Sequence, residues 1–341
     1  MKIGILTSGG DCPGINATIR GVGKTAINHY GMEVIGIHNG FSGIINKDVS
    51  TLTERSLSGI LNLGGTILGT AREKTFRKLI TSPDEEDRKT IKKAYHELGL
   101  DCLVCIGGNG TQRTTWMLSE MGLNVVGVPK TIDNDVWGTD ITFGFDTAVG
   151  IATEAIDRLH STASSHRRVM VIELMGHHAG WITLNSGMAG GADIILLPEL
   201  GYNMKVIIDK INERLKMGKP YSIVAVAEGL EIHGSKMRPA NFFAHHIEKE
   251  TGIETRETVL GYVQRGGSPS PFDRTLGTEL GGHATQLIYE GKFGRMVSVK
   301  GRGISDVPLS EVAGKLRLVT PDNNLVVQGK RIGISFGVTD D

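Results

Sequence analysis

Short hydrophobic runs alternate with helical patterns along the chain. The runs are rich in β-branched residues and cover positions 2–7, 32–38, 102–106, 125–128, 169–174, 194–197, 222–227 and 258–263. Most are almost continuously hydrophobic, which is typical of parallel strands covered on both faces. Segments of helical length, such as 87–98 and 204–216, lie between them. The pattern predicts the α/β class, with open, doubly wound and mainly parallel sheets.

The length of the chain, 341 residues, predicts two domains, because a single hydrophobic core rarely serves more than about 250–300 residues. Glycine occupies 47 of these positions, roughly twice the usual share of about 7%. No Gly-X-Y period accompanies the excess, so we attribute it to tight turns and to backbone that approaches a ligand. No repeat or long linker in the sequence marks where one domain ends.

Charge and cysteine content exclude several classes of protein. Lys and Arg together number 37, as do Asp and Glu, so the chain has no net charge to hold nucleic acid or a membrane surface. The longest apolar runs, such as 194–197, are far shorter than the roughly 20 residues of a membrane span, and residues 1–7 are too few for a signal-peptide core. Three cysteines cannot form a disulfide framework. We therefore expect a cytoplasmic protein that binds neither nucleic acid nor membranes.

Two further patterns suggest metal binding but are better explained otherwise. Cys102 and Cys105 lie in a predicted buried strand, where positions three apart face opposite sides. The histidine pairs at 177–178 and 245–246 have no cysteine or carboxylate at ligand spacing, and neighbours in sequence point in different directions. We therefore expect no zinc or redox centre at these positions.

Three of the predicted strands are followed by loops that suit a polyphosphate. The loops have the sequences SGGDCPG (8–14), GGNGT (107–111) and PKTIDND (129–135). Because ligands of open α/β sheets bind at the carboxyl ends of strands, the three loops should converge. Their glycines let backbone N–H groups approach an anion, and the helices that follow contribute the positive ends of their dipoles. The first loop lacks the GxGxxG spacing of a dinucleotide-binding dehydrogenase.

Asp133 and Asp135 add two carboxylates to the third loop. An Asp-Asn-Asp sequence by itself is typical of a surface turn, but here it follows Lys130 and Thr131 at the end of a strand. One carboxylate can take a proton from a hydroxyl nucleophile while the other holds Mg²⁺ on the phosphates. The loop therefore favours phosphoryl transfer to an alcohol.

Four motifs give the sequence a family resemblance. They are GGDCPGINATIR (9–20), GGTILGTAR (64–72), PKTIDND (129–135) and TVLGYVQRGGSP (258–269). With them the chain resembles the phosphofructokinase family over nearly its whole length, in particular the short bacterial, actinomycete-like branch. NAD kinases and lipid kinases share only a loop like the one at 107–111, so the other three motifs argue against those families.

The resemblance implies a glycolytic kinase that transfers a phosphoryl group from ATP to the 1-hydroxyl of fructose 6-phosphate, with Mg²⁺ as cofactor. Asp133 is then implied to be the general base, with further catalytic roles for Arg72, Thr131, Asp135 and Lys130. The implied donor-binding residues are Gly10, Arg72, Arg77, Gly108, Asn109, Gly110 and Thr111, and the implied metal ligands are Asn109 and Asp135. The implied sugar-phosphate contacts are Thr131, Asp133, Arg168, Met175, Gly176, His177, Glu228, Arg256, Tyr262 and Arg265.

The resemblance also implies two doubly wound domains with the active site in the cleft between them. The phosphoryl-donor domain is expected to hold residues 1–144 and 265–313, and the sugar-phosphate domain residues 145–264 and 314–341. In the family, the counterparts of Arg168 and Arg256 reach in from a neighbouring subunit, which implies a homotetramer.

Three residues depart from the family pattern and leave alternatives open. Asn109 replaces an acidic residue that helps to hold Mg²⁺, and His177 replaces an arginine, so that a permanent positive charge is lost. Tyr262 stands where many relatives have histidine. An enzyme with an altered sugar acceptor, or a regulatory paralogue that only binds sugar phosphates, is therefore an alternative.

The phosphoryl donor has two candidates. Relatives that use pyrophosphate commonly carry Asp in the position of Gly110 and Lys in that of Lys130. Gly110 leaves room for the α-phosphate of ATP, whereas Lys130 favours a compact anion. We expect ATP, because the absence of a side chain at Gly110 is stronger evidence about the donor than the positive charge of Lys130. Pyrophosphate is kept as the alternative.

Overall fold

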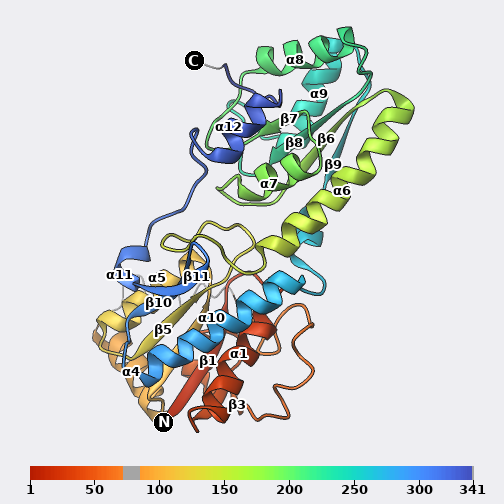
Figure 1. Cartoon of the computed structure of the whole chain (residues 1–341). Coiled ribbons are helices and arrows are strands. Elements are labelled where there is room, and N and C mark those ends of the chain that lie inside the picture. The colour runs from red at the N-terminus through yellow and green to blue at the C-terminus, as the bar shows by residue number, and fades with distance from the viewer. Residues whose placement is uncertain (72–84, 340–341) are drawn as a thin grey trace. The chain divides into compact units, whose positions relative to one another are not determined.

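The computed structural model describes residues 1–71 and 85–339. They fold into two compact units (Figure 1). The first unit consists of Met1–Asp146 and Arg265–Arg317, and the second of Thr147–Gln264 and Leu318–Asp341. The chain therefore passes from one unit to the other three times. The domain ranges expected from the sequence end within a few residues of these boundaries.

The first unit holds a sheet with helices on its two faces. Its strands are β1 (Lys2–Ser8), β2 (Glu33–Ile37), β3 (Val49–Thr51), β4 (Cys102–Gly107), β5 (Val125–Pro129), β10 (Arg295–Lys300) and β11 (Gly303–Pro308). Its helices are α1 (Ile15–Asn28), α2 (Ser42–Asn46), α4 (Glu85–Glu97), α5 (Asn109–Glu120), α10 (Pro271–Tyr289) and α11 (Leu309–Val312).

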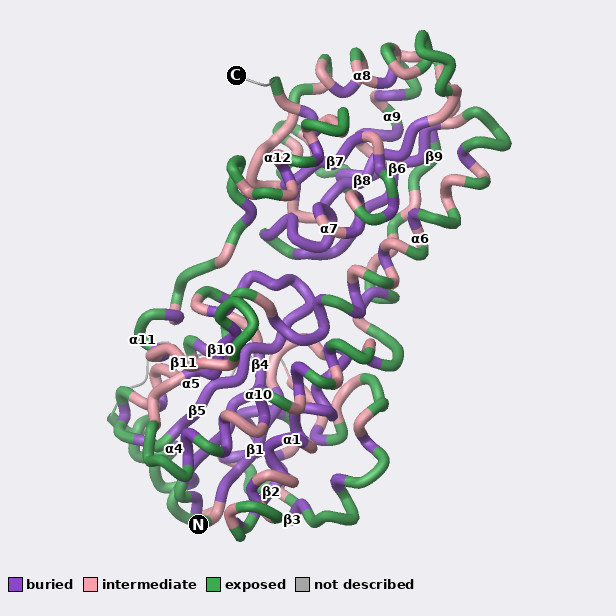
Figure 2. Tube along the Cα trace, viewed as in Figure 1, coloured by how far each residue is buried: buried purple, intermediate pink, exposed green. Residues whose placement is uncertain are grey.

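Within the described residues, the strands of this unit pair in the order β11-β10-β5-β4-β1-β2-β3. The inner five run parallel, and β11 and β3 pair antiparallel at the edges. β1, β4 and β5 are buried along most of their length (Figure 2), which explains why their sequences are hydrophobic at nearly every position. Leu103 and Cys105 belong to the core that includes α4 and α5, while α1 and α10 pack together against the sheet.

The second unit is a smaller α/β unit. Its strands are β6 (Val169–Leu174), β7 (Ile194–Leu196), β8 (Ser222–Ala227) and β9 (Thr255–Val259), which pair in parallel in the order β7-β8-β6-β9. Its helices are α7 (Trp181–Ala189), α8 (Met204–Lys216), α9 (Pro239–Thr251) and α12 (Asn324–Arg331). The core between the sheet and α8 and α9 includes Val171, Val224, Ile207 and Phe243. Two helices cross the unit boundaries: α6 (Phe145–His166) and the 3-10 helix η1 (Gly261–Arg265).

The α/β class with mainly parallel sheets is confirmed, and so are most of the predicted strands and the two predicted helices. The prediction of a strand at 258–263 is wrong. The strand there is β9, which ends at Val259, and η1 follows. Tyr262 and Val263 are 80% and 66% exposed, so the hydrophobicity of this run does not reflect burial in the sheet. No helix among the described residues is both long and apolar enough to cross a membrane.

Candidate active site

The three glycine- and aspartate-bearing loops begin at adjacent positions on one edge of the first sheet. Ser8 at the end of β1 pairs with Gly107 at the end of β4, and Gly107 pairs with Pro129 at the end of β5. The strands are parallel, so their carboxyl ends lie at the same edge. The loops after them therefore start side by side, as expected from the sequence.

The loop after β1 is fixed by contacts to its backbone carbonyl groups. Gly9 has a φ of 86°, in the left-handed region that glycine adopts without strain, and its carbonyl accepts a hydrogen bond of 2.6 Å from the Thr70 hydroxyl. The Nζ of Lys130 donates to the carbonyl of Gly10. Because Lys130 follows β5, this bond ties the first loop to the third.

The loop after β4 leads directly into α5. Gly108 is the N-cap of that helix, so the free N–H groups of its first turn lie beside the loop. The hydroxyl of Thr111 donates to the carbonyl of Ser8 at 3.4 Å, which joins this turn to the end of β1. A side chain at Gly110 would meet no atom within 4 Å, so the space in front of this residue is open. The helix start is therefore accessible to an anion.

The loop after β5 forms a tight turn around Asn134. This residue has a φ of 53°, which is uncommon for a residue with a side chain but is tolerated by asparagine. Its Oδ1 accepts a hydrogen bond of 3.0 Å from the backbone N–H of Thr142. The Thr131 hydroxyl accepts one of 3.1 Å from the N–H of Asp133. These contacts explain the Asp-Asn-Asp order, because the turn needs an asparagine at its middle position and sets the two aspartates on either side of it.

Burial shifts the pKa values of two ionisable groups in this turn, Lys130 and Asp135. Lys130, Asp133 and Asp135 are all buried. Burial raises the pKa of Asp135 to about 7, and repulsion from the Asp133 carboxylate adds to the rise. Burial lowers the pKa of the Lys130 ammonium, and the nearby Arg265 guanidinium contributes to the lowering. Shifts of this kind, on two groups in one turn, are typical of catalytic sites.

Asn109 and Asp135 have the chemistry of a Mg²⁺ site. The Nδ2 of Asn109 donates to the Asp135 carbonyl at 3.4 Å, while its Oδ1 is buried and accepts no hydrogen bond. A buried oxygen without a donor next to a carboxylate suits a cation, and Mg²⁺ commonly takes one or two protein oxygens together with phosphate oxygens and water. The described residues contain no group of three or more His, Cys, Asp and Glu that could hold a metal by themselves. The residues present therefore fit a Mg²⁺ ion that arrives with a polyphosphate.

Residues 64–71 of the GGTILGTAR motif lie against β1 and α1. Asn16, in the first turn of α1, donates to the carbonyls of Leu63 and Gly64 at 3.1 and 3.2 Å and accepts from the N–H of Ile67 at 2.9 Å. The Thr7 hydroxyl donates to the carbonyl of Gly69 at 2.7 Å. The structure thus brings this motif to the carboxyl end of β1. Arg72 and Arg77, which were implied to bind the donor, lie outside the described residues.

Four of the implied sugar contacts come together in the second unit. Leu174 at the end of β6 pairs with Ala227 at the end of β8, and the residues that follow are Met175–His177 and Glu228. Glu228 Oε1 accepts hydrogen bonds from the backbone N–H groups of Gly176 at 3.3 Å and His177 at 3.0 Å. A Cβ at Gly229 would lie 1.8 Å from the His177 carbonyl oxygen, so glycine is required there. The Glu228 carboxylate therefore holds the loop that ends at His177.

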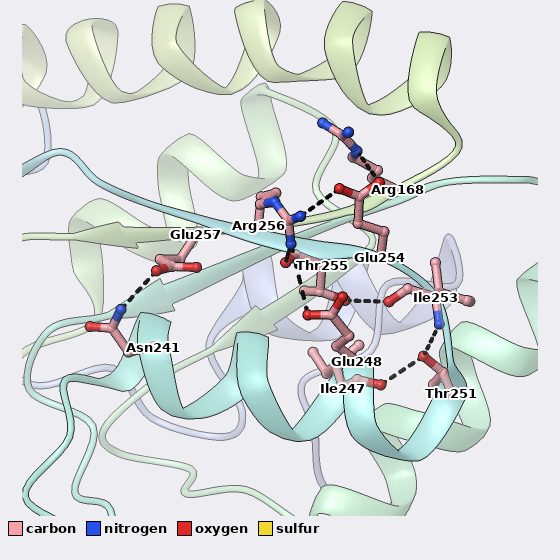
Figure 3. A network of polar contacts seen from close by, with 10 residues as sticks. All are labelled: Arg168, Asn241, Ile247, Glu248, Thr251, Ile253, Glu254, Thr255, Arg256 and Glu257. Atoms are coloured by element: carbon pink, nitrogen blue, oxygen red, sulfur yellow. Dashed lines mark hydrogen bonds and ion pairs between the residues drawn. The ribbon is translucent and has the colours of Figure 1, made fainter.

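Arg168 and Arg256 meet at one carboxylate in the second unit (Figure 3). The Nε of Arg168 lies 2.7 Å from Oε2 of Glu254, and the Nη2 of Arg256 lies 2.6 Å from Oε1 of the same residue. Arg256 also approaches Glu248 on α9 at 3.8 Å. The side chains of Arg168 and Arg256 are 26% and 51% exposed. Tyr262 lies in η1, where it is mostly exposed.

The family model of phosphofructokinase matches residues 2–288, which is most of the chain. The chain belongs to the phosphofructokinase family. It is 68% identical over 337 residues to the ATP-dependent 6-phosphofructokinase 3 of Bacteroides thetaiotaomicron, with 99% of this chain and 100% of the relative covered. It is 47% identical over 370 residues to the ATP-dependent 6-phosphofructokinase of Propionibacterium freudenreichii, with 99% of each covered. The resemblance that the four motifs indicate is confirmed.

The fold of a solved phosphofructokinase agrees with this membership. The enzyme from Saccharomyces cerevisiae matches with a TM-score of 0.80 at 32% sequence identity. The match covers 91% of this chain and 45% of the yeast chain, so this chain spans less than half the length of that relative.

Two arginines of this phosphofructokinase chain make contacts that the sequence does not reveal. Arg265, implied to bind the sugar phosphate, belongs to the first unit and donates from Nη1 to the Asp11 carbonyl at 3.2 Å. Arg317, which the sequence analysis missed, donates from Nη1 to the Asn134 carbonyl at 3.1 Å. No motif surrounds Arg317, and the contact joins positions 183 residues apart, so local sequence carries no signal for it.

Proposed function

We propose that the protein is an ATP-dependent 6-phosphofructokinase, which transfers the γ-phosphoryl group of ATP to the 1-hydroxyl of fructose 6-phosphate. The observation that carries the proposal is the alignment of Ser8, Gly107 and Pro129, from which the two glycine loops and the aspartate turn begin. Relatives that are 68% and 47% identical over almost their whole length are named for this activity. The open space at Gly110 supports ATP over pyrophosphate, because it leaves room for an α-phosphate.

In this proposal Asp133 is the general base. Its carboxylate takes the proton of the sugar 1-hydroxyl while that oxygen forms a bond to the γ-phosphorus, and the bond from the γ-phosphorus to the β,γ-bridging oxygen breaks to release ADP. Thr131 holds the backbone of Asp133 in place. Lys130, bonded to the Gly10 carbonyl, supplies a positive charge between the first and third loops. We assign stabilisation of the transferring group to Arg72, and donor binding to Arg77, on the family resemblance alone.

The remaining donor-side roles follow from the loops. The N–H groups at the start of α5, with Gly10, Gly108, Gly110 and Thr111, would bind the phosphates of the donor. Asn109 and Asp135 would hold Mg²⁺, which when bound neutralises charge on the β- and γ-phosphates. Asp135 must lose its proton to serve as a ligand, and its raised pKa places that step near neutrality.

We assign the sugar phosphate to the residues of the second unit and to Arg265. The backbone of Met175–His177, held by Glu228, would contact the sugar, and Arg168 and Arg256 would bind its 6-phosphate. Because the side chain of Arg256 is exposed and that of Arg168 is partly exposed, both are available to a neighbouring copy of the chain, and we propose a homotetramer in which subunits share these two arginines. A glycolytic role would place the enzyme in the cytoplasm.

The experiment that tests the proposal crosses two donors with several acceptors. Purified protein with Mg²⁺ is mixed with ATP or pyrophosphate and with fructose 6-phosphate, fructose or another sugar phosphate, and the products are separated and identified. We expect turnover with ATP and fructose 6-phosphate and a second phosphate on carbon 1. Turnover only with pyrophosphate would overturn the choice of donor. Binding of fructose 6-phosphate without transfer from either donor would favour a regulatory protein.

A further inference from the structure

The third chain crossing between the units carries hydrogen bonds on both sides. Leu316 forms an antiparallel bridge with Val136, directly after the aspartate turn. The backbone N–H of Arg317 donates to the Asp135 carbonyl at 2.9 Å, in addition to the bond from its guanidinium to Asn134. Two residues further on, the N–H of Val319 donates to Oε1 of Glu199 at 3.0 Å. We call residues 316–319 the crossing segment.

Arg317 fixes the backbone that directly follows the strained position in the aspartate turn. Asn134 has a left-handed backbone, which persists in a non-glycine residue only when surrounding contacts hold it. The carbonyls of Asn134 and Asp135 belong to the peptide groups on either side of Asp135 and accept the two bonds from Arg317. A bond from a guanidinium is charge-assisted and stronger than one between neutral groups. Both of these bonds from Arg317 reach the backbone of the turn, so they set the positions of the carboxylates that the turn carries.

Glu199 holds the other end of the crossing segment. Its Oε1 accepts from the N–H of Val319 and also from the N–H of Gly180, at 2.9 Å. Gly180 is the N-cap of α7. It lies three residues after His177, which ends the loop that Glu228 holds. The same carboxylate oxygen therefore joins the crossing segment to the start of α7. A continuous path of bonds leads from the aspartate turn through Arg317 and Val319 to the loop that precedes α7.

From these contacts we infer that Arg317 and Glu199 are positioning residues for phosphoryl transfer, which together fix the aspartate turn and link it to the proposed sugar-binding loop. The inference rests on the proposed function and extends it to two residues that act through the backbone of the turn and not directly on the reacting atoms. Their loss should misplace the turn and lower the rate of the chemical step while leaving the ATP-binding loops after β1 and β4 intact. Displacement of a catalytic group by about 1 Å can reduce a rate roughly 100-fold.

The first test compares Arg317→Met with Lys315→Met. Arg317→Met keeps an unbranched side chain but removes the donor. Lys315→Met removes a positive charge two positions away, from an exposed side chain near the ring of Trp137. We expect Arg317→Met to lower kcat by roughly 10- to 100-fold, with the Kd of ATP and the KM of fructose 6-phosphate within about twofold of wild type. Lys315→Met should behave as wild type. A kcat of Arg317→Met equal to that of Lys315→Met would overturn the inference.

Three further variants keep the inference falsifiable if Arg317→Met does not fold. Arg317→Lys retains the charge but cannot reproduce the guanidinium geometry, so we expect a severalfold lower kcat; wild-type kcat in this folded variant would contradict the inference. At the other end of the crossing segment, Glu199→Leu removes both acceptor oxygens and should lower kcat. Glu199→Gln retains one acceptor oxygen and should keep most of the wild-type kcat. Equal kcat values for these two variants would also count against it.

The double variant Arg317→Met/Glu199→Leu tests the link between the two residues. Because they act through one segment, their effects on kcat should not multiply, and the double variant should be close to the slower single variant. Effects that multiply fully would overturn the link. Wild-type protein assayed alongside separates this inference from the proposed function. If wild type transfers no phosphate, both the proposed function and this inference are wrong. If wild type does transfer phosphate, the kcat values of the variants test the inference alone.

Discussion

Arg168 and Arg256 share one carboxylate, that of Glu254, whose two oxygens each accept from a different guanidinium. The hydrogen bond from Arg168 lowers the pKa of Glu254, and the charge of Arg256 adds to the effect, so the group is ionised at neutral pH. Two guanidinium groups around one anion is also the arrangement that a phosphate would require. Glu254 therefore occupies part of the hydrogen-bonding capacity that we assign to the sugar 6-phosphate.

Replacing Glu254 with Gln should strengthen sugar-phosphate binding. The amide keeps the shape of the side chain and removes the negative charge that competes with the phosphate. We expect the KM for fructose 6-phosphate to fall by no more than about fivefold, because ion pairs that water can reach are weak. The fall should shrink at high salt. The matched control is Glu250→Gln, at an exposed glutamate in the last turn of α9, four positions before Glu254. A higher KM in Glu254→Gln alone would mean that the carboxylate is needed to hold the arginines.

Asp135 should make the folded protein less stable as the pH rises from about 4 to about 7. Its pKa is raised from 3.8 to about 7 in the folded protein, so between these values the folded chain holds a proton that the unfolded chain has released. The stabilisation is complete below the lower value and is lost as the pH passes the upper one. In Asp135→Asn this dependence is absent, so the variant should gain stability relative to wild type by up to ~1.4 kcal/mol per pH unit across this window.

Urea unfolding of wild type and Asp135→Asn without Mg²⁺, at several pH values from about 5 to about 8, measures this difference. A gap between the two proteins that widens up to about pH 7 and then stays constant agrees with the expectation. A gap that is the same at every pH would show that Asp135 has an ordinary pKa in the folded protein.

Gly110→Asp should lower the activity with ATP and leave the fold intact. A Cβ at this position meets no atom within 4 Å, so the substitution is sterically permitted. Its carboxylate would stand beside the helix start that we assign to the donor phosphates, and opposed like charges cost several kcal/mol. We expect kcat/KM for ATP to fall by more than roughly tenfold, and the ratio of pyrophosphate to ATP activity to rise. Gly110→Ala controls for bulk without charge, and an equal loss in both variants would rule out an electrostatic cause.

The fold was largely predictable because the buried strands carry a strong local signal. β1, β4 and β5 are buried on both faces, so hydrophobicity without alternation identified them, and the polar loops after them identified the carboxyl edge. β9 was misplaced for the opposite reason. Its sequence, TRETV, is polar and partly exposed because the strand lies at a sheet edge. Of the hydrophobic residues that suggested a strand at 258–263, Tyr262 and Val263 belong to η1.

The site was predictable only where its residues follow strand ends. Lys130, Asp133 and Asp135 come directly after β5, so their convergence with the glycine loops follows from parallel topology. The pairing of Arg168 with Glu254 and the contact of Arg317 with Asn134 join residues far apart in sequence. Such contacts depend on tertiary packing, and neither hydrophobic periodicity nor motif spacing reports them.

The most direct test of the account is the turnover of Asp133→Asn with ATP, Mg²⁺ and fructose 6-phosphate. Asparagine preserves the size of the side chain but cannot accept the hydroxyl proton, so kcat should fall by roughly 10²- to 10⁴-fold. Unfolding and ATP binding should stay as in wild type, and Asp140→Asn, at an exposed carboxylate of the same unit, should remain active. If Asp133→Asn instead turns over at a rate within about twofold of wild type, Asp133 is not the base and the central claim is wrong.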